Sequence, residues 1–179
     1  IIVFEDNFHG RTVTIVSFSV DPIARDNYGP YTPGFVVVPS DDLEAVMKAV
    51  NKNTVGILVE PIQGEAGVAV PSEGFLKGLE EIARENNVLL AVDEIQTGLC
   101  RTGKTFAFQH EGVDPDLIIM GKALGGGVFP VSAVAADKEV LGVFQPGSHG
   151  STFGGNPLAC AVAIEALDVL IDEKMSERA

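Results

Sequence analysis

Three polar side chains follow two hydrophobic runs of the chain, and together their types could carry out chemistry. The run 88–92 is followed by Asp93 and, shortly after, by Gln96. The run 117–120 is followed two residues later by Lys122. In open α/β sheets, ligands bind beyond the carboxyl ends of the strands. We therefore expect a carboxylate, an amide and an amine to converge on one crevice.

These three groups meet the needs of an aldehyde cofactor with a pyridine ring. A lysine amine near its reference pKa of about 10.4 is protonated and cannot attack a carbonyl. Desolvation or a nearby positive charge lowers that pKa and frees the nucleophile to form a Schiff base. A buried carboxylate keeps the pyridine nitrogen protonated by raising the ring pKa by about 1–3 units. The amide could bind the ring hydroxyl oxygen and set the rotation of the ring.

Each of these residues taken alone has an ordinary explanation. A lysine after an apolar strand is usually a surface residue, and an aspartate there could cap a helix or hold Mg²⁺ as in nucleotide hydrolases. The phosphate-binding pattern GxxxxGK[ST] would need a glycine and a hydroxyl where Asp116 and Ala123 stand. The run Gly125–Gly127 does not complete GxGxxG, because Pro130 occupies the last position. Both nucleotide-binding motifs therefore fail.

The elements that must position these side chains alternate between strands and helices. This alternation, with strands that are apolar throughout, predicts an α/β fold with a mostly parallel sheet and helices on both faces. Expected strands are Ile1–Phe4, Val36–Val38, Val55–Val59, Val88–Val92, Leu117–Met120 and Val131–Ala136. Expected helices are Val13–Ser17, Asp41–Val50, Ser72–Asn87 (with Ser72 as the cap) and Asn156–Asp172, and Asp21–Pro33 is expected to be an ordered loop.

One strand should run against the others. Only Gly121–Pro130 connects the strand that ends at Met120 with the strand that starts at Val131. A parallel return needs about a dozen residues or more. We therefore expect the strand Val131–Ala136 to be antiparallel to its neighbour.

Composition excludes several classes of function. A formal net charge of −13 argues against binding to nucleic acid or to an anionic membrane surface. The longest apolar runs are far shorter than the ~20 residues that span a bilayer. Two cysteines provide no disulfide framework, and no Cys/His cluster indicates a metal, so we expect a cytoplasmic protein. Because the chain opens inside a strand-like run at Ile1–Phe4, we expect it to be an excerpt of a longer chain.

Five strings, in order over nearly the whole chain, resemble the class III pyridoxal-phosphate-dependent aminotransferases, most closely the ornithine aminotransferase branch. The strings are NFHGRT (7–12), EPIQGEAGV (60–68), VDEIQTGLCRTG (92–103), GKALGGGVFPVSA (121–133) and HGSTFGGNPLA (149–159). The resemblance implies the large domain of a fold-type I enzyme. Residues 1–179 would be its central part, without the upstream phosphate-binding loop and the downstream small domain.

The resemblance also implies roles for single residues. Lys122 would carry the cofactor as a Schiff base and then act as the acid and base of the reaction. Asp93 would pair with the pyridinium nitrogen, and Gln96 would contact the ring hydroxyl. Phe8 would stack on one face of the ring, although an aromatic residue there could also belong to the core. Val92 or Ile95 would pack on the other face.

The remaining implied residues face the substrate or a second subunit. Arg11 would bind a substrate carboxylate, and Glu65 would pair with a gating arginine beyond this segment. Ser151 and Thr152 would reach the cofactor phosphate of the partner subunit in a homodimer.

The implied reaction moves the δ-amino group of L-ornithine to 2-oxoglutarate, which yields glutamate 5-semialdehyde and glutamate. Acetylornithine or 4-aminobutyrate is the alternative donor. A catalytically inactive segment that serves as a dimerisation module is the alternative of another class.

Overall fold

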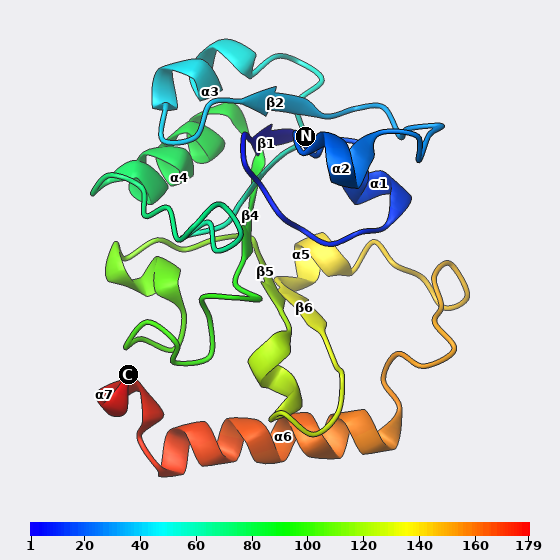
Figure 1. The fold of residues 1–179 in the computed structure, drawn as a ribbon, viewed down its shortest axis with the longest axis vertical. Coiled ribbons are helices and arrows are strands. Elements are labelled where there is room, and N and C mark those ends of the chain that lie inside the picture. The colour runs from blue at the N-terminus through cyan, green and yellow to red at the C-terminus, as the bar shows by residue number, and fades with distance from the viewer.

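The computed structural model describes residues 1–179 and contains one six-stranded sheet in the order β2-β1-β3-β4-β5-β6 (Figure 1). The first five strands in this order are parallel, and β6 is antiparallel to β5. This confirms the predicted α/β fold with a mostly parallel sheet. The strands are β1 Ile2–Phe4, β2 Val36–Val38, β3 Gly56–Val59, β4 Leu89–Asp93, β5 Leu117–Met120 and β6 Ala133–Ala136.

The antiparallel direction of β6 follows from the short connection before it. Leu117 pairs with Ala136 and Met120 pairs with Ala133, so the chain turns back along β5. The connection contains only the single 3₁₀ turn η2 (Lys122–Gly125) and no crossover helix. The prediction made from the length of this connection is confirmed, because a chain this short cannot return to start a parallel strand.

Helices α3 (Leu43–Ala49) and α4 (Phe75–Asn86) pack against one face of the sheet and bury the main core there. Leu79 of α4 and Ile57 of β3 are completely buried, and each such side chain contributes about 1.5–3 kcal/mol by leaving water. The core contains Ile2, Phe4, Val38, Val46, Ile57, Val59, Phe75, Leu76, Leu79, Ile82, Ala83, Val88, Leu90, Val92, Phe108 and Val113.

The other side of the strands carries the shorter helices α1 (Val13–Val16), α2 (Pro22–Arg25) and α5 (Lys138–Leu141) (Figure 1). They leave this face partly open, since Leu89 in β4 is 39% exposed and Val134 in β6 is 50% exposed. The long helix α6 (Pro157–Asp172) crosses the end of the molecule that holds η2, and α7 (Met175–Arg178) follows it. None of these helices has the length and apolar character needed to cross a membrane.

Side-chain caps begin two of the predicted helices. Asp42 caps α3 by accepting a hydrogen bond from Ala45 N at 2.9 Å, and Asn156 caps α6 by accepting one from Ala159 N at 2.9 Å. The predicted cap of α4 is wrong. Gly74, not Ser72, is the N-cap residue, and the Ser72 hydroxyl instead donates to Asp41 at 2.6 Å.

Five short helical segments were not predicted from the sequence: α2, α5, α7, η2 and a further 3₁₀ segment after β4. The expected loop Asp21–Pro33 contains α2, which Asp21 caps by accepting a hydrogen bond from Ile23 N at 2.9 Å. An aspartate followed by proline is the usual start of a helix, so this signal was present in the sequence. The segment after β4 contains the 3₁₀ helix η1 (Ala107–His110).

Candidate active site

The carboxyl ends of β3, β4 and β5 open onto one small cavity of about 130 Å³. Because Val59 in β3 pairs with Val92 in β4, the residues that follow them, Glu60 and Asp93, stand side by side at this edge of the sheet. The expected convergence of Asp93, Gln96 and Lys122 is present here. The cavity is lined by Phe8, His9, Gly10, Glu60, Asp93, Ile95, Gln96 and Lys122.

Asp93 is held by two hydrogen bonds inside this cavity. Its side chain is 5% exposed, its Oδ1 accepts a hydrogen bond from Ile95 N at 3.0 Å, and its Oδ2 lies 2.7 Å from His9 Nδ1. A carboxylate oxygen accepts more than one hydrogen bond, so a further donor can still approach Asp93. The carboxylate is therefore buried and oriented but still able to bind another group.

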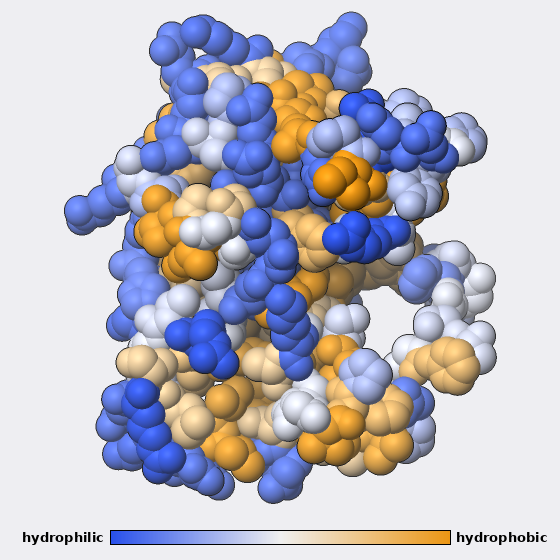
Figure 2. Space-filling model, viewed as in Figure 1, coloured by the Kyte–Doolittle hydropathy of each residue, from blue (hydrophilic) through white to orange (hydrophobic).

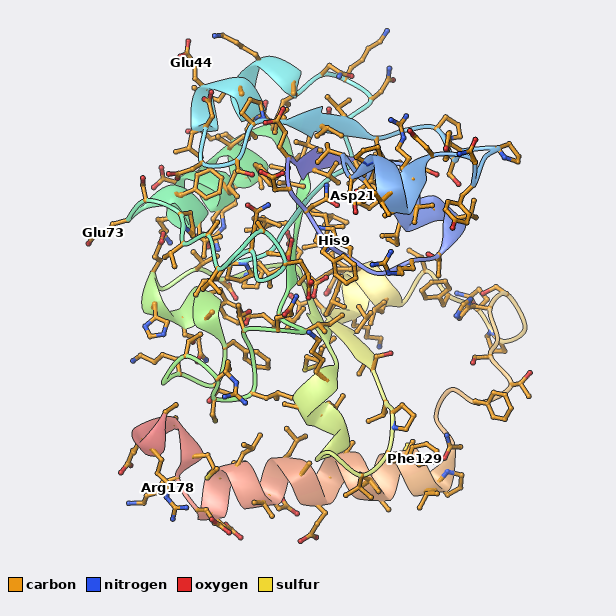
Figure 3. The ribbon with its side chains drawn as sticks, in the orientation of Figure 1. His9, Asp21, Glu44, Glu73, Phe129 and Arg178 are labelled. Carbon is orange, nitrogen blue, oxygen red and sulfur yellow. The ribbon has the colours of Figure 1, made fainter.

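His9 is the first functional residue that the sequence reasoning did not identify. Its side chain is 3% exposed and lies near the centre of the molecule (Figure 3). Because its Nδ1 faces the Asp93 carboxylate, Nδ1 is the protonated donor, and the buried Nε2 has no partner. His9 is separated from Asp93 by 84 positions in the chain. Its place next to Phe8 was the only signal that could have drawn attention to it.

Glu60 is the second residue that was missed. It is 7% exposed, and its Oε2 accepts a hydrogen bond from Phe8 N at 3.0 Å. Burial raises the pKa of Glu60 above its usual value, and the hydrogen bond from Phe8 N–H opposes part of this rise. Glu60 directly follows a buried strand, as Asp93 does, and this position was the available signal.

The structure chooses between the two aliphatic residues expected to face the ring. Val92 is fully buried and belongs to the core on the helix side of the sheet, because side chains alternate along a strand. Ile95 instead lines the cavity. A Cβ atom on Gly121 would come within 3.3 Å of Ile95 Cγ1, so the glycine leaves room for that side chain. Val92 is thus excluded, and Ile95 is the candidate.

Lys122 starts the η2 turn with a φ of 42°, in the left-handed region that a lysine rarely adopts. Leu124 N donates to Gly121 O at 3.0 Å and closes this turn around the lysine. The Lys122 side chain is exposed. The η2 turn therefore places an exposed lysine among the residues that line the cavity.

Gln96 contacts Gly64 and Glu65 in the segment after β3. Its Nε2 donates to Glu65 Oε1 at 3.3 Å. A Cβ atom on Gly64 would lie 2.7 Å from Gln96 Oε1, so a larger residue at position 64 would displace the amide from its present position. The expected residue Glu65 thus contacts the expected residue Gln96 directly.

Arg11 and Glu65 line a larger neighbouring cavity of about 330 Å³. The two cavities share Phe8, His9 and Gly10, and Asp21 also lines the larger one. The Arg11 guanidinium carbon lies 5.5 Å from the centre of the Phe8 ring, which is a cation–π contact. A cation for a carboxylate therefore lies next to the cavity that holds Lys122 and Asp93.

Ser151 and Thr152 lie apart from these cavities. Both are exposed, and they belong to the loop between α5 and α6. The Ser151 hydroxyl accepts a hydrogen bond from Gly154 N at 2.9 Å, within the same loop. The structure does not bring these two residues to Lys122 within one chain.

Glu94 follows Asp93 but has a structural role. Its side chain is 1% exposed and accepts hydrogen bonds from the Thr97 hydroxyl and from Phe108 N, the latter at 2.9 Å. Burial raises the pKa of Glu94. These bonds tie the 94–108 segment together behind the cavity.

The family model for class-III aminotransferases matches residues 1–179 of this chain. The chain belongs to this family. This class-III aminotransferase chain is 63% identical over 178 residues to ornithine aminotransferase from Brevibacillus brevis and 60% identical over 178 residues to ornithine aminotransferase from Bacillus cereus. Each alignment covers 99% of this chain and 45% of the relative, so the chain spans less than half the length of these proteins.

Solved structures show the same relationship. Ornithine aminotransferase from Toxoplasma gondii superposes with a TM-score of 0.97 at 53% identity, over 99% of this class-III chain and 42% of that one. That structure is described as showing partial occupancy of PLP at its active site. Acetylornithine aminotransferase from Elizabethkingia anophelis superposes with a TM-score of 0.82 at 50% identity, over 99% of this chain and 41% of that one. The predicted relationship to fold-type I aminotransferases is thereby confirmed.

Proposed function

We propose that the full-length protein carrying this sequence is an ornithine δ-aminotransferase that uses pyridoxal phosphate bound to Lys122. It would move the δ-amino group of L-ornithine to 2-oxoglutarate and release glutamate 5-semialdehyde and glutamate. The observation that carries the proposal is the single cavity lined by Lys122, Asp93 and Gln96. In this proposal residues 1–179 are the central part of the cofactor-binding large domain, between a phosphate-binding loop upstream and a small domain downstream.

The residues of the cavity fit the cofactor. The buried Asp93 carboxylate can receive a protonated ring nitrogen, and Phe8 and Ile95, which both line the cavity, would pack against the faces of the ring. When bound, pyridoxal phosphate supplies an electron sink for the carbon that loses its proton. The protein supplies the orientation and the electrostatics of that sink.

Asp93 and His9 act on the ring nitrogen in this proposal. The ionised Asp93 carboxylate holds the proton on that nitrogen, since an ion pair raises the ring pKa. His9 donates from Nδ1 to Asp93 Oδ2 and prevents the carboxylate from rotating away.

Lys122 moves the proton in this proposal. Lys122 lines the cavity, and a lysine in such a place can both bind an aldehyde carbon and act as a general base. Phe8 and Ile95 exclude water from the two faces of the ring. Gln96, clamped by Gly64 and Glu65, presents its amide to the ring hydroxyl.

Arg11 and Glu65 support the assignment of the substrate site. The planar guanidinium of Arg11 is suited to a bidentate pair with a substrate carboxylate. All three candidate donors carry that carboxylate, so Arg11 alone does not select among them. The ornithine branch is favoured because the two relatives at 60% and 63% identity are named ornithine aminotransferases.

A comparison of amino donors tests the substrate. With the full-length enzyme and 2-oxoglutarate, we expect kcat/KM for ornithine to exceed the values for acetylornithine and 4-aminobutyrate by about tenfold or more, a margin that one recognised group in a pocket supports. Initial rates of glutamate formation measure it. Faster turnover of acetylornithine would assign the protein to the other branch, to which the Elizabethkingia anophelis neighbour belongs by name.

We further propose a homodimer in which Ser151 and Thr152 reach the cofactor phosphate of the partner subunit. Both residues are exposed and line neither of the two cavities described above. Apolar side chains are exposed in the loop that holds them and along α6, at the lower end of the molecule in Figure 2, and exposed apolar surface is typical of a protein interface. The exposed large apolar residues of these segments are Val143, Phe144, Phe153, Leu158, Ile164, Val169 and Ile171.

Mixed dimers test this arrangement. A subunit with Lys122→Ala and a subunit with Ser151→Ala and Thr152→Ala are each expected to be poorly active alone. Their hybrid should recover activity at one of its two sites, because the first subunit supplies the hydroxyls and the second supplies the lysine. Hybrids no more active than either parent dimer would contradict the proposal.

The alternative of a catalytically inactive dimerisation module makes a different prediction. Such a segment would form no covalent bond with pyridoxal phosphate, whereas Lys122 of the proposed enzyme is labelled when borohydride is added. A location in the cytoplasm also remains a prediction, and the two free thiols, Cys100 and Cys160, are compatible with a reducing compartment.

A further inference from the structure

The segment 8–11 contributes residues to both cavities but has very little main-chain support. Asn7 before it is anchored, since its Nδ2 donates to Phe4 O at 2.6 Å. Within residues 8–11, the hydrogen bond from Phe8 N to Glu60 Oε2 is the only one made by a main-chain group. Gly10 has a φ of 115° with open space around its Cα, which adds freedom to the segment.

Two neighbouring carboxylates hold this segment from the edge of the sheet. Glu60 at the end of β3 accepts from the main chain of Phe8, and Asp93 at the end of β4 binds the side chain of His9. The parallel register of β3 and β4 places these carboxylates next to each other. The neighbouring residues Phe8 and His9 are thus hydrogen-bonded to the ends of the neighbouring strands β3 and β4.

The position of Phe8 also affects the position of Arg11, because the two side chains are in contact. The Phe8 ring borders both cavities, and the Arg11 guanidinium lies over this ring at 5.5 Å from its centre. Arg11 makes no ion pair or hydrogen bond with another side chain of this chain. A shift of the Phe8 main chain would therefore displace an aromatic wall of one cavity and the cation of the other.

We propose that Glu60 is a positioning residue that holds the Phe8 main chain and thereby places the Phe8 ring and the Arg11 guanidinium. The inference rests on the proposed function, in which these two groups face the cofactor and the substrate carboxylate. Glu60 itself acts through Phe8 and touches neither reacting group. Its burial at 7% exposure makes the hydrogen bond strong, because water does not compete for the Phe8 N–H.

Amide hydrogen exchange in the cofactor-free, full-length protein tests the anchoring directly. Glu60→Leu removes the acceptor and keeps the volume, and we expect exchange at the Phe8 amide to become about tenfold faster, the effect of one lost hydrogen bond. Glu60→Gln keeps an acceptor oxygen and should restore protection. Glu60→Asp, which keeps the acceptor on a shorter side chain, gives an intermediate result and serves if the leucine variant does not fold.

In the cofactor-loaded enzyme, Glu60→Leu should raise KM for the amino donor several-fold more than it lowers kcat, because Arg11 is displaced. The visible circular dichroism of the bound cofactor should also change, and Glu60→Gln should restore both properties. The matched control is Glu80→Leu, since Glu80 is another buried carboxylate that accepts a main-chain hydrogen bond, from Asp114 N at 3.1 Å. It should lower the melting temperature and leave Phe8 exchange, KM and the spectrum unchanged.

Two results would overturn the inference. Wild-type exchange at Phe8 and wild-type KM in Glu60→Leu would show that the hydrogen bond does not place the segment. A Glu60→Gln variant as defective as Glu60→Leu would show that charge, and not the acceptor, matters. If no variant or wild-type protein transaminates, the proposed function fails, and the exchange experiment still decides the anchoring.

Discussion

Replacing Lys122 with alanine in the full-length enzyme should lower kcat/KM for ornithine by at least about 10⁴-fold, because general acid–base catalysis alone contributes about 10²–10⁴-fold and covalent attachment is lost as well. Borohydride treatment followed by mass spectrometry should find no cofactor bound at position 122. Alanine is strained by the φ of 42° as lysine is, so the substitution changes the chemistry more than the backbone.

A second lysine provides the control for this experiment. Lys138 at the start of α5 is also exposed but lines neither cavity. Lys138→Ala should keep the wild-type rate and the wild-type labelling at Lys122. Turnover of ornithine by Lys122→Ala at the wild-type rate would show that another amine carries the cofactor.

Replacing Asp93 with asparagine has the second largest expected effect. An ion pair raises the pKa of a protonated partner by about 1–3 units, so its loss should lower kcat/KM by about 10–10³-fold. The asparagine side chain keeps one acceptor oxygen for His9 Nδ1 and is close in size to aspartate, but it loses the hydrogen bond from Ile95 N. The visible spectrum of the bound cofactor, titrated with pH, reports the protonation of the ring directly.

Asp116→Asn is the matched control for Asp93→Asn. The Asp116 carboxylate accepts a hydrogen bond from Leu90 N at 2.7 Å. Asp116 directly precedes β5, so it lies at the opposite end of the strands from Asp93. This variant should lose stability and keep the wild-type spectrum and KM. An unchanged pH titration of the cofactor in Asp93→Asn would rule out the assignment of Asp93 to the ring nitrogen.

The position of the site makes chemical sense in a chain with a net charge of −13. In the proposed function, an anionic cofactor and a substrate carboxylate need local cations, and Arg11 and Lys122 border the two adjoining cavities. Two buried carboxylates, Asp93 and Glu60, lie beside the cavity but need not repel a bound anion. Asp93 is paired with His9, and burial raises the pKa of Glu60. The charge of the surface therefore does not determine what the cavity binds.

The sequence by itself determined the features that depend on neighbouring residues. Continuous apolar runs marked the strands, and the polar residues after them marked the edge of the sheet where Asp93, Gln96 and Lys122 meet. The short connection Gly121–Pro130 determined the direction of β6, because chain length limits which strands it can join. Helix caps at Asp42 and Asn156 were equally local.

The tertiary structure alone decided which distant groups became partners. Phe8 and Glu60 are 52 positions apart and His9 and Asp93 are 84 positions apart, and the sheet order β1-β3-β4 brings the segment after β1 to the ends of β3 and β4. Alternation along β4 turns Val92 into the core, and Ile95, which follows the strand, lines the cavity. Local patterns of hydrophobicity predict which residues form a strand, but hydrogen-bond partners depend on which strands lie side by side, and that is a property of the whole fold.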